Sequence, residues 1–177
     1  MHSSHDAWGA TACVLNGRLF VAGGEASDRL QMWDTKKWTL KAPMPAHCYF
    51  AASAVHEGKM MVIGGRGDDE PSTSVILYDP QTDTWADGPP LPSPRMDCRA
   101  VEHAGVVILV GGHGRPLQFK DGRWSELPPS LLEWRRHCCG VLYDGESWIR
   151  CNLACVIFPA GKRSFRRVFL LLLRFCA

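Results

Sequence analysis

Short apolar runs bounded by glycine and proline recur along most of the chain. Three of them read LFVA, MMVI and VILV, and each ends at a Gly-Gly doublet, namely Gly23-Gly24, Gly64-Gly65 and Gly111-Gly112. Short apolar runs between turn residues predict β-strands rather than helices. The pattern therefore predicts an all-β protein.

A further glycine lies six residues before each doublet, at Gly17, Gly58 and Gly105, and the same pattern begins again at Gly145. Successive copies are 41, 47 and 40 residues apart. Apolar stretches flank these glycines, which predicts a two-residue hairpin turn with positive φ at each one. Asn16-Gly17 and Asp144-Gly145 are the strongest of these turn signals.

An aromatic pair follows each doublet and predicts two further strands in every copy. The pairs are Trp33 with Trp38, Tyr78 with Trp85, and Phe119 with Trp124. Each copy thus reads as a four-stranded antiparallel sheet, which must stack on other sheets to bury both of its faces. Radial stacking of four-stranded sheets produces a β-propeller.

The pattern of Gly-Gly, aromatic residue and Trp resembles the kelch repeat, and the resemblance covers residues 7 to about 145. It implies an all-β, kelch-type β-propeller fragment of four-stranded antiparallel blades with an incomplete ring. The predicted blades span residues 7–46, 47–94 and 95–134, and a fourth starts at 135–146. We expect a structural role for the signature residues, which are Gly23, Gly24, Trp33, Trp38, Gly64, Gly65, Tyr78, Trp85, Gly111, Gly112, Phe119 and Trp124.

A closed propeller needs about four to eight blades, and three complete copies are present. We therefore expect a fragment or a truncated isoform. An arc of three blades leaves two open apolar faces, which predicts a partner, self-association through those faces, or aggregation.

Residues 147–177 share neither the composition nor the period of the repeats. Lys162, Arg163, Arg166 and Arg167 precede the apolar sequence VFLLLLRF. Three interpretations of this divergent basic and apolar tail stay open. The first is an alternative carboxyl terminus, an intron read through or a shifted frame. The second is a basic amphipathic segment that binds a membrane or a partner, and the third is a poorly formed helix that covers the last blade.

The net charge of +2 hides an uneven distribution along the chain. Residues 1–146 carry 14 basic and 18 acidic residues, whereas the last 31 residues carry six basic residues and no acidic one. A mildly acidic body argues against nucleic acid as a partner, because that binding depends on clustered Lys and Arg. The run from Val168 to Leu173 is too short to span a bilayer, so we expect no transmembrane segment.

Eight cysteines would suit a disulfide framework in a small secreted chain, but the first residues, MHSSHD, do not read as a signal peptide. We therefore expect reduced thiols and an intracellular protein, cytoplasmic or nuclear. The cysteines form no CxxC pair, and their spacing does not match a zinc site. We predict neither a metal nor another cofactor.

Antiparallel strands reverse direction at each turn, so the loops after the doublets and the connections between blades lie at one end of the propeller. Arg95 and Arg135 both lie ten residues before a turn glycine at that end, where Cys48 stands in the preceding copy. Arginine suits bidentate capture of carboxylates, which predicts an acidic peptide as ligand. The alternative is that these arginines brace loop carbonyls or pair with acids such as Asp97. The candidate partner-binding residues are Arg29, His47, Arg66, Asp68, Asp69, Arg95, His113, Arg115, Arg135 and Arg136.

The resemblance implies a protein–protein interaction module, such as the substrate-recognition part of a ubiquitin-ligase adaptor or a scaffold. The alternative is an enzyme of the galactose-oxidase-like, sugar-epimerase-like or specifier type. Such a copper site would need two tyrosines and two histidines, and Tyr78 already belongs to the repeat signature. His56 and His103 share one register, two residues before a turn glycine, which favours a role in the repeat. We therefore predict a protein that is not an enzyme.

Overall fold

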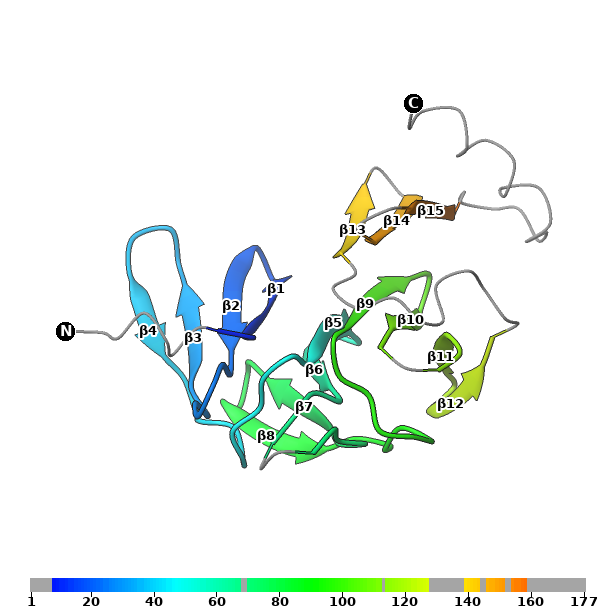
Figure 1. Ribbon diagram of the computed structural model, residues 1–177. Coiled ribbons are helices and arrows are strands. Elements are labelled where there is room, and N and C mark those ends of the chain that lie inside the picture. The colour runs from blue at the N-terminus through cyan, green and yellow to red at the C-terminus, as the bar shows by residue number, and fades with distance from the viewer. Residues whose placement is uncertain are drawn as a thin grey trace.

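The computed structural model describes residues 8–67, 70–112 and 114–127 with their side chains, and residues 139–143, 146–151 and 154–158 as strand backbone. Every element assigned in these ranges is a β-strand (Figure 1). No helix suited to crossing a membrane is found in the part of the chain that the structure describes.

Three four-stranded antiparallel sheets account for the strands before residue 127, with neighbouring strands following the chain order. We refer to these sheets as the first, second and third blades. The first blade contains β1 (Thr11–Leu15), β2 (Arg18–Ala22), β3 (Leu30–Trp33) and β4 (Trp38–Leu40). The second contains β5 (Ala52–His56), β6 (Lys59–Ile63), β7 (Val75–Asp79) and β8 (Thr84–Asp87). The third contains β9 (Cys98–His103), β10 (Val106–Gly111), β11 (Leu117–Lys120) and β12 (Arg123–Glu126).

Two-residue turns join the first two strands of each blade, as the sequence predicts. Asn16 and Gly17 have φ angles of 52° and 72°, and Gly58 and Gly105 have 74° and 79°. Positive φ at both central residues is the geometry that matches the twist of a tight hairpin. The corresponding Asp144-Gly145 pair lies outside the described residues.

The Gly-Gly doublets occur where the connection between two blades passes close to the end of the second strand. A Cβ atom on Gly23 would collide with the carbonyl oxygen of Cys48, and one on Gly64 with that of Arg95. At Gly112 a Cβ atom would lie 2.6 Å from the carbonyl oxygen of Met96. These positions therefore require glycine for space as well as for positive φ.

The aromatic pairs of the signature lie across β3 and β4 and their counterparts. Tyr78 pairs with Trp85, and their ring centroids are 5.1 Å apart. The corresponding separation is 5.0 Å for Phe119 and Trp124. Aromatic side chains at this spacing bury a large apolar area and fix the pairing of neighbouring strands.

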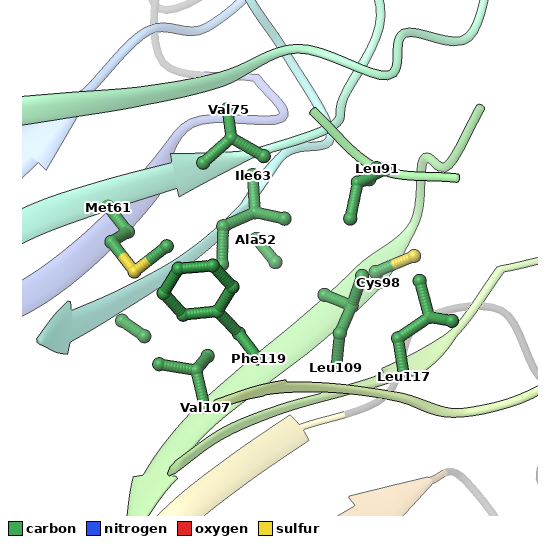
Figure 2. Close-up of a cluster of buried hydrophobic side chains, with 11 residues drawn as sticks. Ala52, Met61, Ile63, Val75, Leu91, Cys98, Val107, Leu109, Leu117 and Phe119 are labelled. Atoms are coloured by element: carbon green, nitrogen blue, oxygen red, sulfur yellow. The ribbon is translucent and has the colours of Figure 1, made fainter. Parts of the chain in front are cut away.

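Two hydrophobic cores hold the three blades together, one at each junction. Alternate residues of β6 supply both: Met60 and Val62 pack toward the first blade, whereas Met61 and Ile63 pack toward the third. This division follows from the period of two residues along a strand. Figure 2 shows the second core, in which Phe119 of the third blade lies among residues of the second.

Hydrogen bonds from tryptophan reinforce both junctions. The Nε1 atom of Trp85 donates to the carbonyl oxygen of Ala42 at 2.9 Å, and that of Trp124 donates to the carbonyl oxygen of Pro89 at 2.9 Å. Each acceptor lies in the connection that leaves the preceding blade. Trp38, the counterpart in the first blade, is 49% exposed.

The outer face of the first blade carries exposed apolar side chains. Val14 is 64% exposed and Leu40 is 68% exposed, in addition to Trp38. We call these three residues the open face. In the second blade, Val55 and Trp85 hold the positions of Val14 and Trp38, and both pack against the core shared with the first blade.

A further sheet follows the third blade and contains β13 (Cys139–Tyr143), β14 (Glu146–Cys151) and β15 (Ala154–Phe158). The strand β13 lies within residues 135–146, and the assignment of this segment to the start of a fourth blade remains a prediction. The strands β14 and β15 continue into the segment that we assigned to the tail, and they pair in antiparallel order. The boundary at residue 146 remains a prediction.

Candidate partner-binding surface

The loops after the doublets and the connections between blades meet at one end of the arc, as the strand order predicts. The amide of Gly24 donates to the carbonyl oxygen of Cys48 at 3.0 Å, and the amide of Gly65 donates to that of Arg95 at 2.7 Å. Cys48 and Arg95 thus occupy equivalent positions in two copies. We call this end of the arc the mouth end.

Arg95 is a candidate contact residue that the structure places inside the protein. Its side chain is 3% exposed, and its Nη2 atom donates to the carbonyl oxygen of Arg115 at 3.1 Å. The backbone amide of Arg95 donates to the carbonyl oxygen of Ser72 at 3.0 Å. This is the bracing geometry that we considered as the alternative to carboxylate capture, and contact between Arg95 and a partner remains a prediction.

Arg66 lies closer to the surface of the mouth end. Its amide and carbonyl exchange hydrogen bonds with the backbone of Tyr49 at 2.7 and 3.1 Å, and its guanidinium lies 5.8 Å from the centroid of the Tyr49 ring. This geometry is a cation–π contact. The backbone pairing holds the arginine and the aromatic ring in one place.

An aromatic cluster that the sequence analysis did not identify extends this site. Trp8, which is 55% exposed, lies 4.7 Å from Phe50 in an edge-to-face arrangement and 6.2 Å from Tyr49. The amide of Phe50 donates to the carbonyl oxygen of Gly9 at 2.7 Å. This hydrogen bond joins the backbone just before β1 to the backbone just before β5. We call Trp8, Tyr49, Phe50 and Arg66 together the mouth cluster.

A periodic signal in the sequence could have revealed this cluster. Trp8, Tyr49 and Met96 each lie nine residues before the turn glycine of their copy. A large side chain therefore stands at the same position in all three blades. The connections carry these positions to the mouth end, where equivalent residues of neighbouring blades come together.

A cleft of about 190 Å³ lies beside the mouth cluster, between the connection that leaves the first blade and the second blade. His47 and Cys48 line it on one side, and Ser72, Ser74 and Asp87 line it on the other. His47 is partly exposed at the edge of this cleft, and its contact with a partner remains a prediction. The cleft offers hydroxyl, imidazole and carboxylate groups to a ligand.

The remaining candidates divide between exposed and undescribed positions. Arg29 and Arg115 are exposed, and the Nη1 atom of Arg115 lies 3.6 Å from the Oε2 atom of Glu126. Five candidates lie outside the described residues, namely Asp68, Asp69, His113, Arg135 and Arg136. Their role as contact residues stays a prediction.

The described thiols are poorly suited to act as nucleophiles. Burial raises the pKa of Cys48 to about 11 and that of Cys98 to about 12. Both thiols donate to backbone carbonyl oxygens, Cys48 to Gly64 at 3.3 Å and Cys98 to Met96 at 3.3 Å. A protonated, buried thiol is a packing group rather than a reactive one.

Comparison with known proteins agrees with this architecture. Residues 47–92, which contain most of the second blade, match the Kelch motif family model. The chain is 31% identical over 158 residues to Kelch-like protein 23 of Mus musculus, with coverage of 76% of this chain and 27% of that protein. It is 34% identical over 159 residues to F-box/kelch-repeat protein At1g67480 of Arabidopsis thaliana, with coverage of 88% of this chain and 38% of that protein.

The fold also matches a solved structure. The structure of YjhT superposes with a TM-score of 0.76 at 17% sequence identity, covering 89% of this chain and 64% of that one. The chain spans about a quarter of the length of Kelch-like protein 23. The repeat signature, the blades and these matches together identify the chain as a member of the kelch-repeat family.

Proposed function

We propose that this chain is a protein-interaction module that binds its partner at the mouth end. The observation that carries the proposal is the mouth cluster, where Trp8 is exposed beside Tyr49 and Phe50 while Arg66 lies over the Tyr49 ring. Tryptophan, tyrosine and arginine are the residues that contribute most often to binding hot spots. The kelch relatives support a module of this kind.

The partner class that we propose is an acidic peptide. Arg66 is partly exposed at the mouth end, and the aromatic rings beside it offer apolar contact area. Arginine binds carboxylates through paired hydrogen bonds, and a nearby ring lowers the hydration of the cation. A peptide with an acidic residue next to an apolar one would use both features.

Fluorescence anisotropy with a labelled peptide tests this proposal directly. The chain is titrated into an acidic peptide that contains one leucine and into a matched peptide with lysine in place of each acid. Arg66→Glu is expected to weaken binding of the acidic peptide at least about tenfold. Lys37→Glu, a change of the same charge in the β3–β4 turn at the opposite end, is expected to preserve it. Equal binding of both peptides, or equal binding by Arg66→Glu and the unaltered chain, would reject the proposal.

The finer role that we propose is recruitment of a substrate to a larger assembly, as part of a ubiquitin-ligase adaptor or of a scaffold. Two of the relatives carry F-box or BTB in their names, namely At1g67480 and Kelch repeat and BTB domain-containing protein 12 of Danio rerio. We propose an intracellular location on the same basis. No observation on the described residues favours one of the enzymatic alternatives.

Self-association through the open face is a separate part of the proposal. Val14, Trp38 and Leu40 expose apolar side chains where the other blades pack against a neighbour. Light scattering on a gel-filtration column is expected to show a dimer that Trp38→Lys converts to a monomer. A monomeric unaltered chain would reject this mode of association.

A further inference from the structure

The junction between the second and third blades contains an open cleft of about 200 Å³. Met61, Leu77 and Phe119 form its apolar wall, and Gly122 lies at its edge. The β5–β6 and β11–β12 turns contribute to the lining, so the cleft lies at the end of the blades opposite the mouth end. It is distinct from the mouth cluster.

The equivalent place between the first and second blades is filled by the protein's own side chains. Leu15 stands where the second blade has His56, and Phe20 stands where it has Met61. Leu15 is 1% exposed and Phe20 is 2% exposed. The Phe20 ring lies 5.8 Å from Tyr78 of the second blade, so two large groups occupy this junction.

Polar contacts also close the first junction. The hydroxyl of Tyr78 donates to the Oδ1 atom of Asp83 at 2.6 Å, and the amide of Ala42 donates to the same oxygen at 3.0 Å. The Nζ atom of Lys41 lies 3.7 Å from the other carboxylate oxygen. We call Ala42, Tyr78 and Asp83 together the clasp.

None of the three clasp groups is available at the second junction. Phe119 replaces Tyr78 and lacks the hydroxyl, and Gly122, two residues before Trp124, replaces Asp83 and lacks the carboxylate. Pro89 replaces Ala42, as the equivalent hydrogen bonds from Trp85 and Trp124 show, and it lacks the amide hydrogen. The two junctions thus differ at several equivalent positions, and the second junction lacks the hydrogen bonds of the clasp; there the His56 ring packs edge-to-face on Phe119 at 5.4 Å.

We infer that this cleft is a second docking site, which receives a single aromatic side chain with a hydrogen-bond donor, an indole or a phenol, from a protein partner. The size supports one ring: a cavity of about 150 Å³ accommodates benzene, whereas pockets for small-molecule ligands begin at about 300 Å³. The wall supports an aromatic occupant, because the lining contains Phe119, whose ring packs favourably against other rings, and the apolar side chains of Leu77 and Pro89.

The rim of the cleft supplies the acceptor. Glu57 lines the cleft and its side chain is 85% exposed, while the Nε2 atom of His56 lies 3.9 Å from its Oε1 atom. Lys59 also lines the cleft, but its Nζ atom lies 3.3 Å from the carboxylate of Asp79. The Glu57 carboxylate is therefore placed to accept a hydrogen bond from the N–H or O–H of the occupant.

Methyl NMR of the chain labelled at methionine tests the site with N-acetyl-tryptophanamide as the probe. The Met61 methyl signal is expected to shift and saturate at a roughly millimolar dissociation constant, as for one isolated side chain. Met60 is the matched control, because it points into the other junction and is expected not to shift. No saturable shift at Met61, or an equal shift at Met60, overturns the inference.

Two variants close the cleft and keep the test informative if one of them misfolds. Met61→Phe restores the filling that Phe20 provides at the first junction. Gly122→Asp places a carboxylate at the cleft edge; an added Cβ meets no atom within 4 Å there, and Asp83 adopts φ 55° at the equivalent position. Each folded variant is expected to weaken probe binding at least tenfold in probe-observed NMR. Unchanged binding in either folded variant contradicts the inference.

The donor requirement is tested by Glu57→Gln. N-acetyl-tryptophanamide is expected to bind this variant about threefold to tenfold less well, whereas N-acetyl-phenylalaninamide is expected to bind the variant and the unaltered chain equally. Equal loss for both probes would remove the hydrogen bond from the proposed recognition.

Discussion

The phenol of Tyr78 donates a 2.6 Å hydrogen bond to the Oδ1 atom of Asp83. The same oxygen accepts a hydrogen bond from the amide of Ala42, which lies in the connection that leaves the first blade. One carboxylate thus joins a strand of the second blade to the chain that precedes it. The Trp85 indole holds the carbonyl oxygen of the same alanine. Both polar groups of Ala42 are therefore fixed by the second blade.

Weakening the Tyr78–Asp83 hydrogen bond from either side is expected to destabilise the protein. Asp83→Asn replaces the charged acceptor of the fully buried Tyr78 with a neutral and weaker amide oxygen, whereas Tyr78→Phe removes the donor. We expect each variant to lower the free energy of unfolding by about 1 kcal/mol. A double-mutant cycle measured by urea unfolding should show coupling between the two changes, and strictly additive effects would contradict a direct interaction.

The clasp also predicts that the stability of the folded chain depends on pH in the acidic range. The hydrogen bond from Tyr78, then that from Ala42, lowers the pKa of Asp83 below its ordinary value of 3.8. A carboxyl whose pKa is lower in the folded state stabilises that state above the unfolded pKa, and this contribution is lost as the pH falls through the folded pKa.

Asp83→Asn is therefore expected to lose less stability than the unaltered chain as the pH falls below about 4. Urea unfolding across this range measures the difference. Lys41→Met is a useful companion, because the Lys41 charge is a lesser cause of the same lowering and its removal should change the profile less. Parallel profiles for Asp83→Asn and the unaltered chain would contradict the assignment.

Two glycines with similar φ separate the effect of space from that of backbone conformation. Gly64 has φ 63° and Gly58 has φ 74°, but a Cβ atom would collide with Arg95 only at Gly64. We expect Gly58→Ala to destabilise the chain by about 1 kcal/mol and Gly64→Ala by about 3 kcal/mol or more. Thermal or urea unfolding of both variants measures this, and equal losses would contradict the close approach.

The raised pKa values predict slow alkylation of the described thiols. Burial raises the pKa of Cys13 to about 12 and that of Cys48 to about 11, so little thiolate forms near neutral pH. Iodoacetamide followed by peptide mass spectrometry is expected to label these two residues slowly in the folded chain and quickly in urea. Rapid labelling of the folded chain at Cys48 would contradict its position beneath the mouth end.

The periodic features of the fold could be predicted from the sequence because they depend on local chemistry. A turn with positive φ needs glycine at Gly17, and a backbone that passes close to another needs glycine at Gly64. Tyr78 and Trp85 pair across adjacent strands, a contact that the strand order already implies. Each of these roles depends on the sequence pattern of a single repeat, so one copy of the repeat is enough to predict it.

The candidate site could be predicted only in part, because its geometry depends on contacts between blades. The sequence places Arg95 at the mouth end, but whether its guanidinium points inward is decided by the Arg115 loop of the next blade. Trp8 and Phe50 lie 42 residues apart and meet through loop backbone. Their contact follows from the stacking of two blades, which no local pattern encodes.

Alternate residues of β6 belong to different junctions between blades. Met60 and Val62 pack in the core shared with the first blade, and Met61 and Ile63 pack in the core shared with the third. The two pairs of side chains belong to different cores, because successive residues of a strand point to opposite faces of the sheet. One strand therefore lets the two junctions differ in shape and polarity, with a clasp at the first and a cleft at the second.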